Sequence, residues 1–207
     1  RVVCRSTSCR KTNCCAAANR SPRQHLLIDR HMFLDIAMGT LGAVGFAHLA
    51  GTEPSLALLG FAIGCALLPD VDALLHLLRR RGFGAGAHTH RDILHYPLVL
   101  IPTVFVLVAF YDLGLAVLAS VLVCAHFVHD SIGIGWGVAW LAPFDRRLFK
   151  LWDDGKFLTI RTPQDVEQAA KQHGDPQWLQ HTYLRPSRTL IIELLALAVA
   201  VLVWWLA

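Results

Sequence analysis

The chain has 207 residues, of which 55% are hydrophobic and only 16% are charged, and its mean hydropathy is +0.47. Soluble globular domains carry charge on about a quarter of their residues, so the composition argues against that class and favours a membrane protein. The net charge of +4 then reflects how loops are oriented across a membrane, and no nucleic-acid partner is expected.

The first segment, residues 1–30, is basic and rich in Ser and Asn, and it has no apolar periodicity. This composition predicts a disordered tail. Four of the six cysteines lie in this tail at spacings that fit no standard zinc site or disulfide framework, namely Cys4, Cys9, Cys14 and Cys15. The other two, Cys65 and Cys124, lie in apolar runs and are expected to act as small hydrophobic residues.

Five apolar runs follow, and each predicts a transmembrane helix: 32–50, 55–69, 96–111, 113–130 and 189–207. Some of them fall short of the roughly 20 residues of a full span, which leaves room for tilted or re-entrant helices. The predicted fold class is all-α, a polytopic integral membrane bundle with about five spans. The alternative is that the two weaker runs are core helices of a soluble protein.

Residues 132–144 are Gly-rich and apolar, and they predict a loop or half-helix packed on protein. The polar stretch after them contains a predicted short helix over 162–174, with Thr162 as its cap, Pro163 in the first turn and Gly174 at its end. The sequence leaves open whether this stretch is a lid or a linker.

The domain organisation follows from these elements. It comprises the tail 1–30, a membrane domain 31–145, a polar cytoplasmic segment 146–188 and a C-terminal transmembrane helix 189–207.

All 19 Lys and Arg residues fall in three segments, 1–30, 79–91 and 146–188. With five spans, these three segments share one side of the membrane, which the positive-inside rule assigns to the cytoplasm. We therefore expect a multi-pass protein of a bacterial-type inner (plasma) membrane.

The same topology brings His and Asp side chains from four helix ends to one depth on the cytoplasmic side. His126 and Asp130 are four residues apart and share a helix face. Asp70 and Asp72 would repel each other unless a cation or proton lay between them. Pro69 disfavours helical geometry at Leu68 and predicts a break there.

Imidazole and carboxylate ligands suit zinc, manganese or iron, and zinc is the first expectation. The predicted metal ligands are His31, Asp70, Asp72, His90, His95, His126 and Asp130. Simpler interpretations stay open for single residues: Asp70 as a helix cap, Arg91 and Asp92 as a surface ion pair, and His129 as a neighbour of the site.

Several short motifs over roughly residues 31–145 resemble the YdjM-like family of inner-membrane metal-dependent hydrolases. They are His31 in RHMFLD, PDVDA (69–73), HRDILHY (90–96), HFVHD (126–130) and GVAWLAPF (137–144). The chain departs from the family pattern in having Ala73 in place of a His, Asp92-Ile93-Leu94 in place of Gly-x-Thr, and Tyr96 in place of a Ser. The resemblance implies a metal-dependent hydrolase in a membrane.

The functional expectation is hydrolysis by a metal-activated water, with Asp72 as general base and Arg91 stabilising charge on a phosphoryl or acyl oxygen. A site at the membrane edge suits an ester or phosphoester, lipid-linked or small. Two alternatives remain: transport of a divalent cation or proton by the same cluster, and haem binding by paired histidines. Several carboxylates in the cluster argue against haem, and few polar residues continue across the spans to form a transport path.

Overall fold

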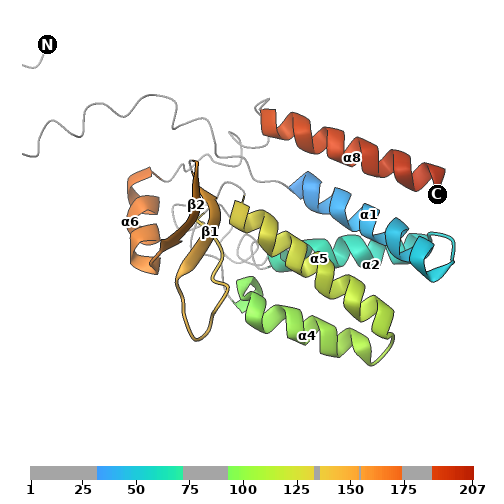
Figure 1. The fold of residues 1–207 in the computed structure, drawn as a ribbon, viewed down its shortest axis with the longest axis horizontal. Coiled ribbons are helices and arrows are strands. Elements are labelled where there is room, and N and C mark those ends of the chain that lie inside the picture. The colour runs from blue at the N-terminus through green and yellow to red at the C-terminus, as the bar shows by residue number, and fades with distance from the viewer. Residues whose placement is uncertain (1–31, 72–92, 133–135, 154, 174–187) are drawn as a thin grey trace, which may run out of the picture.

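The computed structural model describes residues 32–71, 93–132, 136–153, 155–173 and 188–207. Most of them are helical, and five helices lie side by side in one bundle (Figure 1). These helices are α1 (Met32–Ala50), α2 (Leu56–Leu67), α4 (Pro97–Ala109), α5 (Leu113–Ile132) and α8 (Arg188–Leu206). Their ends agree with the five predicted apolar runs to within two residues.

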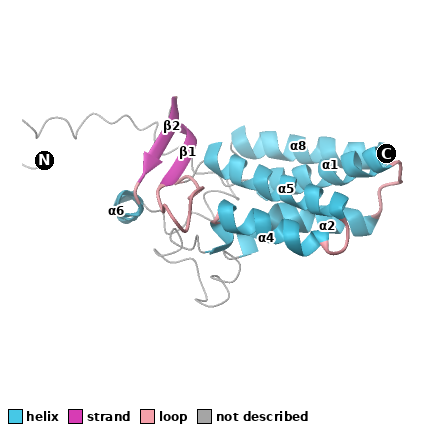
Figure 2. Ribbon diagram, turned by 60° about the horizontal axis from the view of Figure 1, so that its bottom comes forward, coloured by secondary structure: helices cyan, strands magenta, loops and turns pink. Residues whose placement is uncertain are grey.

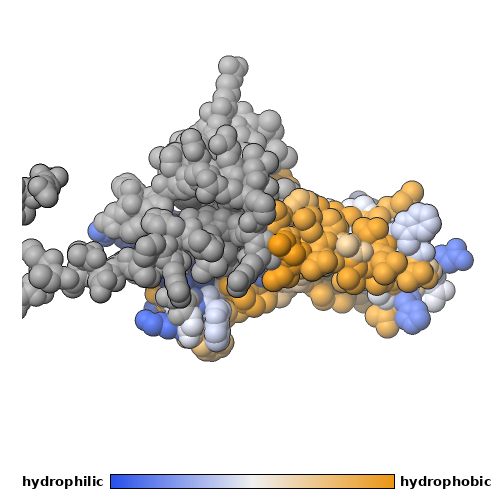
Figure 3. Space-filling model, turned by 90° about the horizontal axis from the view of Figure 1, so that it is seen from above, coloured by the Kyte–Doolittle hydropathy of each residue, from blue (hydrophilic) through white to orange (hydrophobic). Residues whose placement is uncertain are grey.

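Two of these helices are long and apolar enough to cross a membrane, over Phe33–Ala50 and Leu113–Ile132. Within them only 33% and 44% of the residues are buried inside the molecule, so more than half of the residues in each helix are at least partly exposed on its surface. The apolar parts of the other three helices are shorter. The visible face of the bundle is almost continuously hydrophobic (Figure 3), which indicates membrane association.

Helices α1 and α2 pack closely because small residues lie between them. An added Cβ at Gly39 would come within 2.7 Å of the Ile63 Cα atom, so the two backbones touch at this point. The bundle core continues with small buried side chains such as Ala43, Ala62 and Ala119. Small residues of this kind allow helices to approach closely where water supplies no driving force.

A two-stranded antiparallel hairpin corrects the all-α expectation. Strands β1 (Leu148–Asp153) and β2 (Lys156–Arg161) pair with Leu148 opposite Arg161 and Asp153 opposite Lys156. The hairpin lies at one end of the bundle, next to the end of α5 (Figure 2). The predicted polar segment therefore contains regular structure beyond its one expected helix.

The expected helix in that segment is α6 (Pro163–His173). Its cap is reciprocal: the Asp165 amide donates to Thr162 Oγ1 at 3.2 Å, and the Thr162 amide and hydroxyl donate to Asp165 Oδ2 at 3.0 and 2.7 Å. The prediction that Thr162 caps a helix starting at Pro163 is confirmed. Gly174 lies outside the described residues.

In the apolar 132–144 stretch, Ile132 is the last residue of α5 and residues 136–144 are non-helical, which confirms the loop interpretation for 136–144. Gly137 has φ +93°, and a Cβ there would lie 2.7 Å from the Phe149 carbonyl oxygen. Only glycine suits this conformation and this closeness. The next residue, Val138, exchanges two backbone hydrogen bonds with Phe149 and so fastens the loop to β1.

Candidate metal centre

The candidate site lies at the end of the bundle where α2 and α5 end and α1, α4 and α8 begin (Figure 1). Asp70 comes from a 3-10 turn, η2 (Leu68–Asp70), that follows α2. His95 ends a second 3-10 turn, η4 (Ile93–His95), just before α4. His126 and Asp130 lie one turn apart on α5.

Pro69 shapes the turn that carries Asp70. The α-helix ends at Leu67 as predicted, but Leu68 keeps helical dihedrals (φ −54°, ψ −41°), contrary to the expectation of a non-helical residue there. The 3-10 turn explains the difference. Its hydrogen bonds join residues three apart in place of four, and its backbone dihedrals stay in the helical region. Pro69 stands in the first turn of η2 and is buried.

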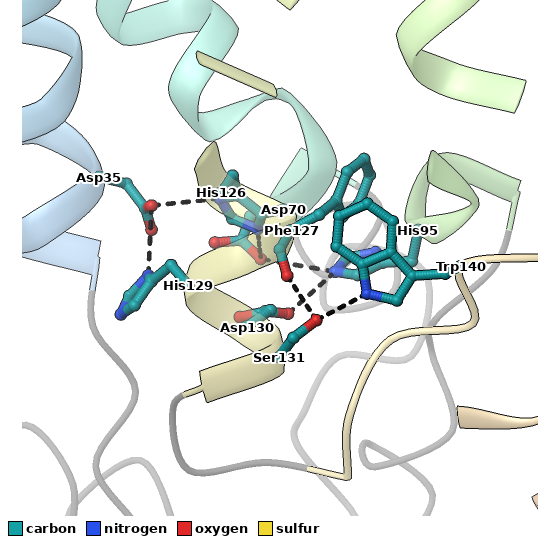
Figure 4. A network of polar contacts seen from close by, with 9 residues as sticks. All are labelled: Asp35, Asp70, His95, His126, Phe127, His129, Asp130, Ser131 and Trp140. Atoms are coloured by element: carbon teal, nitrogen blue, oxygen red, sulfur yellow. Dashed lines mark hydrogen bonds and ion pairs between the residues drawn. The ribbon is translucent and has the colours of Figure 1, made fainter. Parts of the chain in front are cut away.

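Three donor atoms meet at the centre of the site, from Asp70, His95 and His126, and all lie within 4.8 Å of one another (Figure 4). Asp70 Oδ1 is 3.8 Å from His126 Nε2 and 3.9 Å from His95 Nε2. Asp130 adds a second carboxylate, with its Oδ2 atom 3.9 Å from His95 Nε2. These separations are too long for hydrogen bonds.

The donor set fits a divalent cation. Zinc bonds of about 2.0–2.2 Å to nitrogen and oxygen place two ligand atoms of a tetrahedral site about 3.4 Å apart. The observed 3.8 and 3.9 Å exceed this by about half an ångström, which small side-chain rotations can close. His126 Nε2 is buried, and within the described part of the chain it has no hydrogen-bond partner. A buried nitrogen of this kind costs free energy unless something binds it.

The two imidazoles and the two carboxylates differ in exposure. His126 and His95 are 1% and 3% exposed, whereas the Asp70 and Asp130 side chains are 38% and 25% exposed. The imidazole nitrogens therefore lie on the buried side of the site, and the carboxylates lie on its exposed side.

Aromatic side chains pack against the two imidazoles. The Phe127 ring packs edge-on against both His126 and His95, with centroids 6.0 and 6.3 Å away. Trp140 packs against Phe127 at 6.3 Å, and its Nε1 donates a 2.8 Å hydrogen bond to Ser131 Oγ. The apolar loop singled out in the sequence thus supports the site through Trp140.

Two further residues of the cluster were not assigned to the site from the sequence. Asp35 on α1 is 3% exposed, and its Oδ1 atom lies 3.3 Å from His126 Nδ1 and 3.5 Å from His129 Nδ1 (Figure 4). A carboxylate inside an apolar run is the signal that points to Asp35, because an acid at membrane depth needs a partner. His129 was expected only as a neighbour, and it contacts the site through Asp35.

The structure thus brings four of the predicted site residues together: Asp70, His95, His126 and Asp130. The other four lie outside the described residues: His31, Asp72, His90 and Arg91. No family model, curated protein or solved structure matches the chain significantly. Function is therefore argued from the site itself.

Proposed function

We propose that the protein is a membrane-bound metal-dependent hydrolase whose His/Asp site binds a divalent cation, zinc first, and activates water against an ester or phosphoester. The observation that carries this proposal is the convergence of the donor atoms of Asp70, His95 and His126 within 4.8 Å of one another. The motif resemblance to the YdjM-like hydrolases includes the same residues.

Five membrane spans with a cytoplasmic site are part of the proposal. Its support is the complete segregation of Lys and Arg into three segments of the sequence. The hairpin, which carries Lys150, Lys156 and Arg161, lies at the same end of the bundle as the site (Figure 2). We infer that this end faces the cytoplasm.

A divalent cation held by these residues would supply Lewis acidity and, if it is zinc, would lower the pKa of a bound water toward about 7. The residues of the site would each have a separate role. His95 and His126 would hold the cation from the buried side of the site, and the Asp70 carboxylate would balance part of its charge. Asp130, whose Oδ2 atom lies 3.9 Å from His95 Nε2, would add a second carboxylate ligand. Asp72 and Arg91 keep the roles proposed from the sequence, as a general base and an oxyanion partner.

Hydrolysis fits the described residues better than transport. A transport path needs polar groups that continue along the bundle, and the apolar runs of the sequence offer only Asp35, His48 and Glu193 as such steps. Asp35 belongs to the cluster itself, and His48 lies exposed in the last turn of α1. The hydrophobic core cluster of the described residues includes Leu118 and Leu122, and Glu193 on α8 is one buried carboxylate outside that cluster.

The test uses the full chain purified in detergent, measured for bound metal and for zinc-dependent hydrolysis of p-nitrophenyl phosphate and p-nitrophenyl acetate. Asp70→Ala and His126→Ala are compared with Glu53→Ala and His48→Ala, which remove the same types of side chain at exposed positions outside the site.

We expect about one equivalent of metal and chelator-sensitive hydrolysis in the wild type and both controls, and loss of both in the two site variants. Metal content that survives both site substitutions would refute the proposed site. Metal binding without hydrolysis of either compound, together with metal uptake into vesicles, would favour the transporter.

A further inference from the structure

We propose that Asp35 is a positioning residue for the metal centre: it accepts the Nδ1 proton of His126 and so fixes Nε2 as the nitrogen that binds the cation. This inference rests on the proposed function, since it concerns a partner of one proposed ligand. The observation behind it is that Asp35 Oδ1 lies 3.3 Å from His126 Nδ1, that both atoms are buried, and that neither makes a hydrogen bond within the described residues, so the bond between them belongs to the proposal.

The two ring nitrogens of His126 face different partners. Nε2 points to the cluster, 3.8 Å from Asp70 Oδ1, whereas Nδ1 points to Asp35 on a different helix (Figure 4). A neutral imidazole carries one proton, and a carboxylate can only accept, so the proton belongs on Nδ1. The lone pair then lies on Nε2, where the other donors converge.

The setting keeps this arrangement in place. Asp35 and His126 are 3% and 1% exposed, so water does not compete for either group. The Asp35 Oδ1 atom also lies 3.5 Å from His129 Nδ1, one turn along the same helix as His126. Helix α1 is held close to α2 at Gly39, one turn after Asp35, where the backbones touch. The carboxylate therefore lies on a helix that packs tightly against α2.

The energetic consequence is a stronger metal ligand. A carboxylate that accepts the second N–H of a ligating histidine orients the ring and raises its basicity. Loss of such a partner weakens metal binding by about 10–100-fold while the ligands themselves remain. Asp35 should therefore affect affinity and leave the number of bound ions unchanged.

The experiment measures zinc affinity by competition with a chromophoric chelator on the full-length protein in detergent. Asp35→Asn keeps the shape and removes the charge. Asp112→Asn makes the same chemical change at an exposed residue before α5, where the carboxylate only caps the helix by accepting from the Leu115 amide at 2.7 Å. Asp70→Ala and His126→Ala report on the site itself.

We expect Asp35→Asn to raise the Kd for zinc about 10–100-fold at an unchanged stoichiometry, and Asp112→Asn to bind like the wild type. An unchanged Kd in Asp35→Asn, with metal lost in Asp70→Ala and His126→Ala, would overturn the role of Asp35 and leave the proposed function standing. Metal retained in those two variants would instead overturn both.

A measurement on the wild type does not depend on how the variants fold. Long-range proton–nitrogen spectra of the zinc-loaded, histidine-labelled protein, assigned by comparison with His126→Gln, report which ring nitrogen of His126 carries the proton. A protonated Nδ1 and a metal-shifted Nε2 support the inference. Zinc on Nδ1 overturns it.

Discussion

The close contact between α1 and α2 makes the effect of a Gly39→Ala substitution predictable. The added methyl group would lie 2.7 Å from Ile63 Cα and 2.9 Å from Ile63 N, whereas nonbonded carbon atoms rest at about 3.5–4.0 Å. Both obstructing atoms are backbone, so the helices must separate by about 1 Å. Overpacking of this kind costs about 1–3 kcal/mol.

Gly45→Ala on the same helix is the matched control, because a Cβ there meets nothing within 4 Å. Replacing Gly by Ala favours the helix by about 1 kcal/mol at either position, so the difference between the two variants isolates the clash. We expect Gly39→Ala to have the lower free energy of unfolding, by about 1–3 kcal/mol, in denaturant titrations in mixed micelles. Equal free energies in the two variants would refute the close packing of α1 on α2.

Two further predictions concern Ser131 and the cap of α6. Ser131→Ala leaves the Trp140 indole N–H without its acceptor and should lower the free energy of unfolding by about 1–3 kcal/mol. Ser120→Ala is the control, because the Ser120 hydroxyl only donates back to its own helix, and it should lower the free energy of unfolding clearly less. Equal losses in unfolding titrations of the two variants would argue against the Trp140 contact. Hydrogen bonds from Thr162 lower the pKa of Asp165, so the cap is complete above the ordinary pKa of an aspartate and is lost as the pH falls through the lowered value. Amide chemical shifts at the start of α6 should follow this titration in the wild type and stay constant in Asp165→Asn, and the same titration in both proteins would contradict the assignment.

The helices could be predicted because their signal is local. Five apolar runs bounded by Pro, Gly or charged residues give five helices with nearly the predicted ends. The hairpin was missed although Asp154-Gly155 stands between its two strands, a pair typical of tight turns. The polar segment around the hairpin also contains a helix. Two strands of six residues each are too short for their alternation of polar and apolar residues to be recognised in such a segment.

The candidate site could be predicted in part, for a reason that lies in topology. Consecutive helices of a bundle run in opposite directions, so the last residues of one helix and the first residues of the next lie at the same end of the bundle. Asp70, His95 and His126 lie near such helix ends and are close together. The sequence does not show how each helix is rotated about its own axis, and this rotation decides which side chains face the site. Asp35 sits in the first turn of α1, but only the packing of α1 against α5 shows that it faces His126.

The shortness of α2 and α4 follows from the site that they border. Helix α4 has 13 residues and is about 20 Å long, well below the roughly 30 Å of a hydrocarbon core. At the site end, η2 follows α2 and η4 precedes α4, and these 3-10 turns carry Asp70 and His95. On α5, His126 lies six residues before the last residue, about 9 Å inside the helix end. If this polar centre is the proposed hydrolytic site, neighbouring helices that end early leave the space through which water and a substrate would enter. Short helices at this position are therefore compatible with the proposed hydrolytic site.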